Sequence, residues 1–213
     1  MNSVFMGLAE RALEHFGNKT TDQAESTMEI PLAAYRDPDR YADEIERIFK
    51  QLPLAAALSL ELPSAGSYRA MNLLGVPLLL VRGEDMQVRA MLNVCSHRGA
   101  QLCKIGAGTQ KMITCPYHAW SYDDRGDLIG RYGANTFGDI DAADYGLTRL
   151  HCEEKAGIIW VCLTAGKVFD IDTWLGDFGD ELNTLDLDNW HMYDQRDIAG
   201  PGWKVTMDGY LEA

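Results

Sequence analysis

The sequence predicts an α+β protein, in which N-terminal helices precede a mostly antiparallel β domain and the start of an α/β unit follows. Three observations support this class. Apolar residues near the start recur at helical spacing, residues 68–163 contain short apolar segments separated by turn residues, and residues 172–188 are acidic with helical features. We therefore expect a helical segment over residues 1–51, a β domain over residues 52–166 and the beginning of another domain over residues 167–213.

The first expected helix covers the start of the chain as far as Phe16. Its apolar residues share one face at helical spacing: Phe5, Leu8, Ala12 and Phe16. Gly17-Asn18 is a typical helix stop. No cationic leader precedes an apolar stretch, so we expect an amphipathic helix and not a signal peptide.

A second helix is expected from Pro38 to near Gln51. Asp37 suits the N-cap position, because its carboxylate can accept the free N–H groups of the first turn, and Pro38 suits the first helical position. The apolar face of this helix would consist of Tyr41, Ile45, Ile48 and Phe49.

The β domain is expected to begin with three strands, over residues 68–73, 76–82 and 87–94, joined by turns at residues 75–77 and 83–85. A tight turn over residues 124–127 joins two further strand-like segments. Residues 157–163 predict a fully buried strand, because their apolar run is almost uninterrupted. Farther along, residues 190–198 predict a strand that opens a second domain.

The net charge of −13 is concentrated in the second half of the chain. Residues 1–120 carry 13 acidic and 12 basic residues, whereas residues 121–213 carry 19 and 7. Such a chain would repel a phosphate backbone, so we expect no nucleic-acid partner. No apolar run approaches the ~18 residues that a membrane span requires, so we expect no membrane partner either.

Cys95, His97, Cys115 and His118 form the most informative pattern, C-x-H followed after 17 residues by C-x-x-H. Two thiolates can hold one iron of a two-iron, two-sulfide (2Fe-2S) cluster while two neutral imidazoles hold the other, which is the ligand set of a Rieske centre. The pattern therefore predicts that Cys95 and Cys115 bind one iron and that His97 and His118 bind the other. Neutral imidazoles place the potential in a window of roughly −150 to +300 mV.

A structural zinc site of the Cys2His2 type is the competing metal interpretation, since the same side chains suit tetrahedral zinc. Zinc modules usually pair like ligands, whereas each short segment here supplies one cysteine and one histidine. The remaining alternative is that all four are unligated core residues. The mixed pairs favour the iron-sulfur cluster over both alternatives.

The segments that carry these four residues resemble the Rieske domain of the ring-hydroxylating oxygenase alpha subunits. They read Cys95-Ser96-His97-Arg98-Gly99-Ala100 and Cys115-Pro116-Tyr117-His118-Ala119-Trp120, continuing to Leu128. The family commonly has glycine in place of Ala119, whose methyl group would crowd a turn that prefers glycine. Respiratory and photosynthetic Rieske proteins are less similar, because a second cysteine in each loop forms a disulfide. The missing disulfide suits a reducing cytoplasm.

The resemblance implies a complete path for electrons. A ferredoxin or flavin reductase would reduce the cluster, and His97 or His118 would pass the electron to mononuclear Fe(II) in an adjacent subunit of a homo-oligomer (trimer) or an alpha-beta hetero-oligomer. The enzyme, a dioxygenase or monooxygenase, would then hydroxylate a small aromatic or similar apolar substrate with O2. A free-standing Rieske ferredoxin-like carrier without catalysis is the alternative, for which roughly residues 80–163 would suffice.

One further observation concerns the basic residues near the four ligands. Residues 86–122 contain no acidic residue. Their basic residues are Arg89, Arg98, Lys104 and Lys111. Two interpretations remain open, namely ordinary solvated surface charge or a cationic rim around the point at which electrons enter.

Residues 203–213 resemble the start of the family's iron-site helix, with Trp203-Lys204, Asp208 and Glu212 at the matching positions. In that family a Tyr-His pair follows, and its histidine is the first ligand of the mononuclear iron; the sequence stops two residues short of it. The resemblance implies that Glu212 bridges electron transfer between subunits and that residues 167–213 begin the catalytic domain. We expect mononuclear iron only in the complete protein, and no hydroxylation by these residues alone. The remaining histidines lack the spacing of such a site: His15, His151 and His191.

Overall fold

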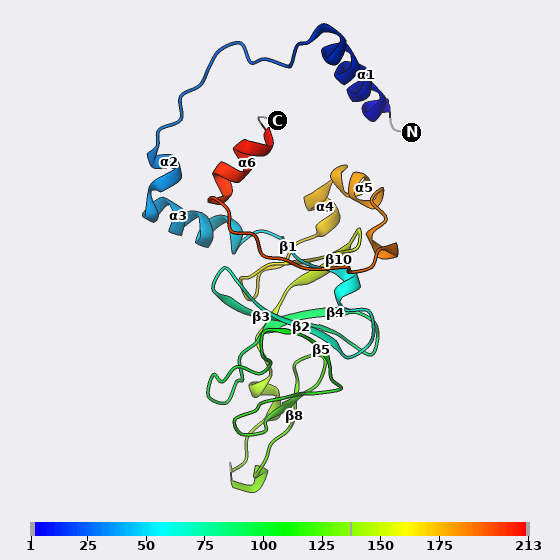
Figure 1. Cartoon of the computed structure of the whole chain (residues 1–213). Helices are drawn as coiled ribbons and strands as arrows, with labels where there is room; N and C mark the ends of the chain where they lie inside the picture. The colour runs from blue at the N-terminus through cyan, green and yellow to red at the C-terminus, as the bar shows by residue number, and fades with distance from the viewer. Residues whose placement is uncertain (1–2, 137, 212–213) are drawn as a thin grey trace.

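The strands form three antiparallel sheets in the computed structural model, which describes residues 3–136 and 138–211 (Figure 1). The strands are β1 (Leu54–Leu58), β2 (Ser67–Leu73), β3 (Val76–Arg82), β4 (Val88–Leu92), β5 (Gly106–Thr109), β6 (Ile113–Thr114), β7 (Ser121–Tyr122), β8 (Leu128–Gly130), β9 (Arg149–Leu150), β10 (Cys152–Lys155) and β11 (Ile158–Val161). The central sheet has the order β5-β2-β3-β4-β9. The sheets β1-β11-β10 and β6-β7-β8 pack against its two faces.

β3 is buried on both faces, which explains its long apolar run. Alternate side chains of a strand point to opposite faces. Leu79 and Val81 belong to the core shared with the β6-β7-β8 sheet, whereas Leu78 and Leu80 belong to the core shared with β11. The central sheet therefore separates two cores, and the predicted ligands lie on the side of the first.

The predicted strands are confirmed, with small shifts at their ends: residues 68–73, 76–82, 87–94 and 157–163 correspond to β2, β3, β4 and β11. The turn between β2 and β3 lies slightly earlier than expected, at Leu74-Gly75. Both residues have positive φ angles, 53° and 82°. Two successive residues with positive φ form a two-residue hairpin turn whose twist matches that of the flanking strands. Val76 and Pro77 therefore remain in β3.

β1 is a strand that the sequence does not predict. Its centre is Ala55-Ala56-Ala57, and alanine has little preference for strands. It forms because β11 offers a free edge, with β10 on the other side. Arg82 links this outer sheet to the central one, since its guanidinium donates to both carboxylate oxygens of Glu154 at 2.6 and 2.8 Å.

The first predicted helix is confirmed as α1 (Ser3–Asn18), which lies apart from the sheets (Figure 1). Its apolar side chains Phe5, Leu8 and Phe16 are exposed. No helix within residues 3–136 and 138–211 has both the length and the apolar character to cross a membrane.

The second predicted helix is also confirmed and has two parts, α3 (Pro38–Glu44) and the π-helical η1 (Ile45–Phe49). A short helix that the sequence analysis did not predict, α2 (Ala33–Arg36), precedes it. Asp37 caps α3 as expected, because its Oδ1 accepts from the N–H groups of Asp39 and Arg40 at 2.9 and 3.2 Å. Capping satisfies backbone donors that have no partner within the helix.

The regular elements of the C-terminal part, over residues 167–211, are all helical: α4 (Ile171–Leu175), α5 (Phe178–Asn183), η5 (Leu187–Asn189) and α6 (Trp203–Leu211). The strand predicted over residues 190–198 is wrong, because these residues form no strand and are all exposed. Their apolar side chains therefore find no sheet to pack against. The segment instead leads to α6, which lies beside α2 and α3 (Figure 1).

Candidate functional site

Two loops at the end of the molecule opposite α1 and α6 carry the four predicted ligands (Figure 1). Residues 95–100 follow β4, and residues 115–120 join β6 to β7. Both loops close in the same way. The cysteine N–H donates to the carbonyl five residues later, and the N–H four residues later donates to the cysteine carbonyl, at 2.8 to 3.0 Å. Each loop is therefore a closed turn that begins with a cysteine.

The two thiols lie inside the protein and the two imidazoles lie nearer its surface. Cys95 and Cys115 are 2% and 3% exposed. Burial is the main cause of a raised pKa of the Cys95 thiol, and the adjacent Cys115 thiol raises this pKa further. His97 and His118 are half-buried, with ring centroids 4.9 Å apart. The loops thus present a pair of thiols and a pair of imidazoles.

This donor set fits a 2Fe-2S cluster. Nδ1 of His118 is buried and has no hydrogen-bond partner among the described residues. Buried polar atoms usually have partners, so a lone pair left free in this position suits a metal ligand. The raised pKa of Cys95 means that burial opposes a bare thiolate, and bound iron would supply the compensating positive charge.

A single zinc ion fits less well. Within residues 3–136 and 138–211, no three cysteine, histidine, aspartate or glutamate side chains are grouped so that they could hold one ion. Four-coordinate zinc requires such convergence. A two-iron cluster does not, because it takes its protein ligands in pairs.

Aromatic side chains enclose the inner side of the site. Trp120 is buried and stacks on His97, with centroids 4.7 Å and planes 3° apart. Tyr145 meets Trp120 edge-on at 5.5 Å. The hydroxyl oxygen of buried Tyr122 lies 3.2 Å from the Cys95 sulfur. Burial raises the pKa of Tyr122 to about 12, so the phenol keeps its proton at neutral pH.

A pocket opens on the other side of the site, beside the imidazoles. Besides His97 and His118, its lining includes Pro116, Tyr117 and Tyr132. Tyr117 and Tyr132 are 61% and 81% exposed. The imidazole end of the site therefore opens onto an apolar surface.

Ala119 is strained, as its place in a glycine-preferring turn predicts. Its φ angle is 53°, and Gly99 occupies the equivalent position of the first loop with a φ of 70°. A side chain in this left-handed region costs roughly 1–2 kcal/mol. Because Ala119 is exposed, the strain lies in its backbone and not in a crowded neighbour.

Asn93 is a supporting residue that sequence reasoning missed. It is 1% exposed, accepts from the Cys103 N–H at 2.9 Å and donates to the Cys103 carbonyl at 2.7 Å. These bonds hold the chain on both sides of the first loop. The available signal was a polar residue at the end of an apolar strand, two positions before Cys95.

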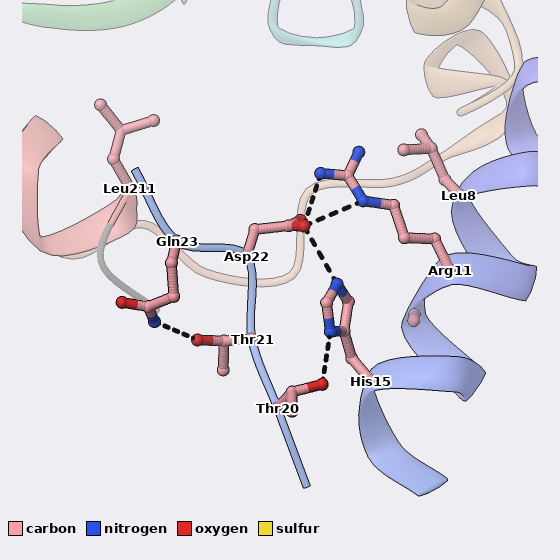
Figure 2. A pocket seen from close by; sticks show the side chains of 9 residues that line it. Leu8, Arg11, His15, Thr20, Thr21, Asp22, Gln23 and Leu211 are labelled. Atoms are coloured by element: carbon pink, nitrogen blue, oxygen red, sulfur yellow. Dashed lines mark hydrogen bonds and ion pairs between the residues drawn. The ribbon is translucent and has the colours of Figure 1, made fainter. Parts of the chain in front are cut away.

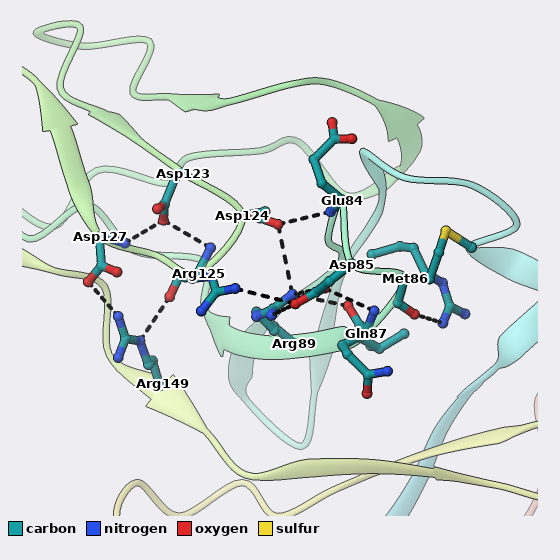
Figure 3. Close-up of polar contacts among 12 residues, drawn as sticks. Glu84, Asp85, Met86, Gln87, Arg89, Asp123, Asp124, Arg125, Asp127 and Arg149 are labelled. Atoms are coloured by element: carbon teal, nitrogen blue, oxygen red, sulfur yellow. Dashed lines mark hydrogen bonds and ion pairs between the residues drawn. The ribbon is translucent and has the colours of Figure 1, made fainter.

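The basic residues of segment 86–122 have different surroundings. Arg89 does not contribute to a free rim, because it donates to Asp85 at 2.8 Å and lies 3.8 Å from Asp124, in a network that also includes Arg125 (Figure 3). The remaining three, which we call the cationic rim, are exposed and make no ion pair with any described residue: Arg98, Lys104 and Lys111.

The other predicted site residues do not join this centre. Glu212 lies outside the described residues. His15, in the last turn of α1, contacts Asp22 and Thr20 at 3.0 and 2.9 Å (Figure 2). His151 bonds to Glu153 at 2.9 Å, and His191 lines a separate pocket. These three histidines therefore remain apart in the described structure.

Comparison with known proteins gives consistent matches. The model of the Rieske [2Fe-2S] domain matches residues 53–136. The glycine betaine monooxygenase oxygenase subunit of Chromohalobacter salexigens is 29% identical over 191 residues, which are 89% of this chain and 42% of that protein. The benzene 1,2-dioxygenase subunit alpha of Pseudomonas putida is 33% identical over 144 residues, which are 67% of this chain and 32% of that protein.

A solved structure agrees with these matches. The quaternary ammonium Rieske monooxygenase CntA, crystallised with an inhibitor, superposes with a TM-score of 0.79 and 27% identity, over 86% of this chain and 52% of that one. The chain spans less than half the length of the two curated relatives above. The loops, the matching domain and these relatives together show that the chain belongs to the Rieske oxygenase alpha subunits and carries their [2Fe-2S] domain.

Proposed function

We propose that Cys95 and Cys115 hold one iron of the cluster and that His97 and His118 hold the other. The observation that carries this assignment is the separation of two buried thiols from two neighbouring imidazoles nearer the surface. The partnerless Nδ1 of His118 supports it. When bound, the cluster supplies a carrier for one electron.

The surrounding residues prepare the site for electron transfer. Trp120 and Tyr122 exclude water from the thiol side, and a dry shell controls the potential of a metal site. The Tyr122 hydroxyl lies 3.2 Å from the Cys95 sulfur and would donate to it once that sulfur is a ligand without a proton, and hydrogen bonds to sulfur also set the potential. His97 and His118 border the open pocket, so electrons would enter or leave on their side.

We infer that the whole protein is a Rieske non-haem iron oxygenase. Residues 52–166 would form the Rieske domain, because β9 to β11 complete its sheets, and residues 167–213 would begin the catalytic domain. Mononuclear iron would bind outside the described residues, where Glu212 would serve as the bridge. A ferredoxin or flavin reductase would supply electrons, and a trimer or alpha-beta oligomer would bring the two metal sites together.

A quaternary ammonium compound is the substrate class that we place first. The relative named for glycine betaine aligns with 89% of this chain, whereas the relative named for benzene aligns with 67%. The aromatic or similar apolar substrate expected from the sequence is the second candidate, which the benzene dioxygenase supports. Oxygen uptake and product analysis by the full-length protein with glycine betaine, carnitine and benzene would separate the two classes.

A free-standing electron carrier is the other function considered. The α6 contacts favour the oxygenase, because the buried Glu44 carboxylate accepts from Trp203 Nε1 and Lys204 Nζ at 3.1 and 2.6 Å. A carrier built on residues 80–163 would contain neither Glu44 nor α6, so this contact would be absent from it.

All five cysteines are free, so we also infer a reducing compartment, the cytoplasm.

Metal analysis tests the cluster assignment. Iron and acid-labile sulfide should each approach about two per chain, and the reduced protein should give a rhombic paramagnetic signal. The purified protein should be red-brown. One zinc per chain without sulfide would contradict the proposal.

A further inference from the structure

Ser96 lies between two predicted ligands and joins a short chain of hydrogen bonds. Its hydroxyl donates to the carbonyl of Tyr145 at 2.6 Å and lies 2.8 Å from the hydroxyl oxygen of Tyr122. The same Tyr122 oxygen lies 3.2 Å from the Cys95 sulfur. It also accepts from the Ser96 N–H at 3.3 Å. Tyr122 therefore has two neighbours to which it can donate.

The number of protons decides the direction of each bond. A carbonyl oxygen only accepts, so the single hydroxyl proton of Ser96 is committed to Tyr145. Ser96 then has no proton for Tyr122, and Tyr122 must donate across the 2.8 Å contact. A cluster-bound Cys95 sulfur carries no proton and can also only accept. The one phenolic proton of Tyr122 is therefore shared between the Ser96 oxygen and the Cys95 sulfur.

We propose that Ser96 lowers the potential of the cluster by drawing the Tyr122 proton away from the Cys95 sulfur. Reduction adds a negative charge to the cluster, and a donor at the sulfur favours the more negative form. The Ser96 oxygen competes with the sulfur for that donor. This proposal rests on the assignment of Cys95 as a ligand.

The turn η4 (Ala142–Tyr145) holds Ser96 in this role. Its Tyr145 carbonyl keeps the Ser96 proton, and its Tyr145 ring packs against Trp120, which stacks on His97. If the turn moved away, the Ser96 proton would be free to bond to Tyr122. The Tyr122 proton would then return to the sulfur. The position of this turn therefore sets how strongly Tyr122 bonds to the cluster.

The midpoint potential of the cluster tests the proposal, with four variants of the same loaded protein. Ser96→Ala should raise the midpoint potential by up to about 59 mV. For a one-electron couple, this shift changes the ratio of reduced to oxidised protein at a fixed applied potential by about tenfold. Tyr122→Phe should lower the midpoint potential. Ser96→Ala added to Tyr122→Phe should produce no further shift, because no phenolic proton remains to be shared. Ser96→Thr keeps a hydroxyl and should leave the potential unchanged.

The result separates failure of this inference from failure of the ligand assignment. If Cys95 is not a ligand, Tyr122→Phe should not change the potential. Two outcomes would show that the proton is not shared and that the inference is wrong. In the first, both Tyr122→Phe and Ser96→Ala lower the potential. In the second, Ser96→Ala raises the potential by the same amount in the Tyr122→Phe variant as in the wild type.

A second measurement covers the case in which Ser96→Ala assembles no cluster. Asp141 caps η4 by accepting from the Ala143 N–H at 3.0 Å, so Asp141→Ala should loosen the turn and also raise the potential. In deuterated buffer, the electron-nuclear coupling of the Tyr122 hydroxyl deuteron to the reduced cluster should increase in this variant. An unchanged potential and coupling would overturn the role of the turn.

Discussion

The cluster loops and the α6 contact are stabilised over very different distances along the sequence. Hydrogen bonds that close the loops join residues four or five positions apart. Glu44 binds Trp203 and Lys204 from 159 and 160 positions away, and Tyr35 donates to Asp208 from 173 positions away. A short sequence motif therefore specifies the loops, whereas the α6 contact requires the N-terminal helices and α6 to pack together.

The largest expected effect is local to the loops. Cys115→Ser should abolish both iron and sulfide, because a serine hydroxyl does not replace a thiolate ligand of the cluster. Cys152→Ser is the control, since Cys152 lies on β10 away from the loops. Metal and sulfide analysis provides the measurement. Retention of the full metal content by Cys115→Ser would remove this cysteine from the ligand set, and α6 should be unaffected in both variants.

Glu44→Gln should affect the α6 contact and leave the cluster loops unchanged. It removes the charge that binds Lys204, so amide hydrogen exchange in α6 should accelerate by about tenfold. The cluster spectrum should stay the same. Glu46→Gln, which alters an exposed carboxylate two positions away, should leave the exchange rate unchanged. Equal exchange in both variants would show that Glu44 does not secure α6.

The Glu44 contact should also depend on pH. The hydrogen bond from Lys204 is the main reason why the pKa of Glu44 lies below its usual 4.5. A lowered folded-state pKa stabilises the contact above pH 4.5, and this stabilisation is lost as pH falls from 4.5 through the lowered value. The protection of the α6 amides, relative to the intrinsic exchange rate at each pH, should therefore fall below pH 4.5 in the wild type. The Glu44→Gln variant should lack this component, and identical pH profiles would argue against the linkage.

Charge reversal in the cationic rim should have a smaller, salt-dependent effect. Changing Lys104 and Lys111 to Glu should slow reduction by an acidic ferredoxin or reductase several-fold at low salt, because rim charges mainly affect association rates. Stopped-flow reduction over a range of ionic strengths measures this. Reversal of Lys19 and Lys167, which lie outside the cluster loops, is the matched control. Equal slowing by both pairs would assign the effect to net charge alone.

The smallest effect is expected from relief of backbone strain in the second loop. Ala119→Gly should stabilise the protein by about 1 kcal/mol, because the left-handed conformation costs less for glycine. The melting temperature should rise by about 2–4 °C. Ala100→Gly, in the first loop and without a positive φ angle, should lower it or leave it unchanged. A lower melting temperature for Ala119→Gly would show that the strain is not in this residue.

Much of the β domain was predictable, because strands β2 to β4 and their turns follow local rules. The four proposed ligands were also visible from their spacing, although their metal binding stays a prediction. β1 was not predictable, since an alanine run forms a strand only because β11 offers an edge. The strand predicted over residues 190–198 failed for the opposite reason, because no partner covers its apolar residues.

The sequence by itself determined the two closed loops, the placement of the four predicted ligands on them and the alternation that buries β3 on both faces, because these depend on neighbours a few positions apart. Only the tertiary structure decided which hydrogen-bond and ion-pair partners these side chains have. It placed Tyr122 between Ser96 and Cys95, paired Arg89 with Asp85 and Asp124, and brought Glu44 to α6. In each case at least one partner, Tyr122, Asp124 or Glu44, comes from a distant segment and arrives only when the chain packs together.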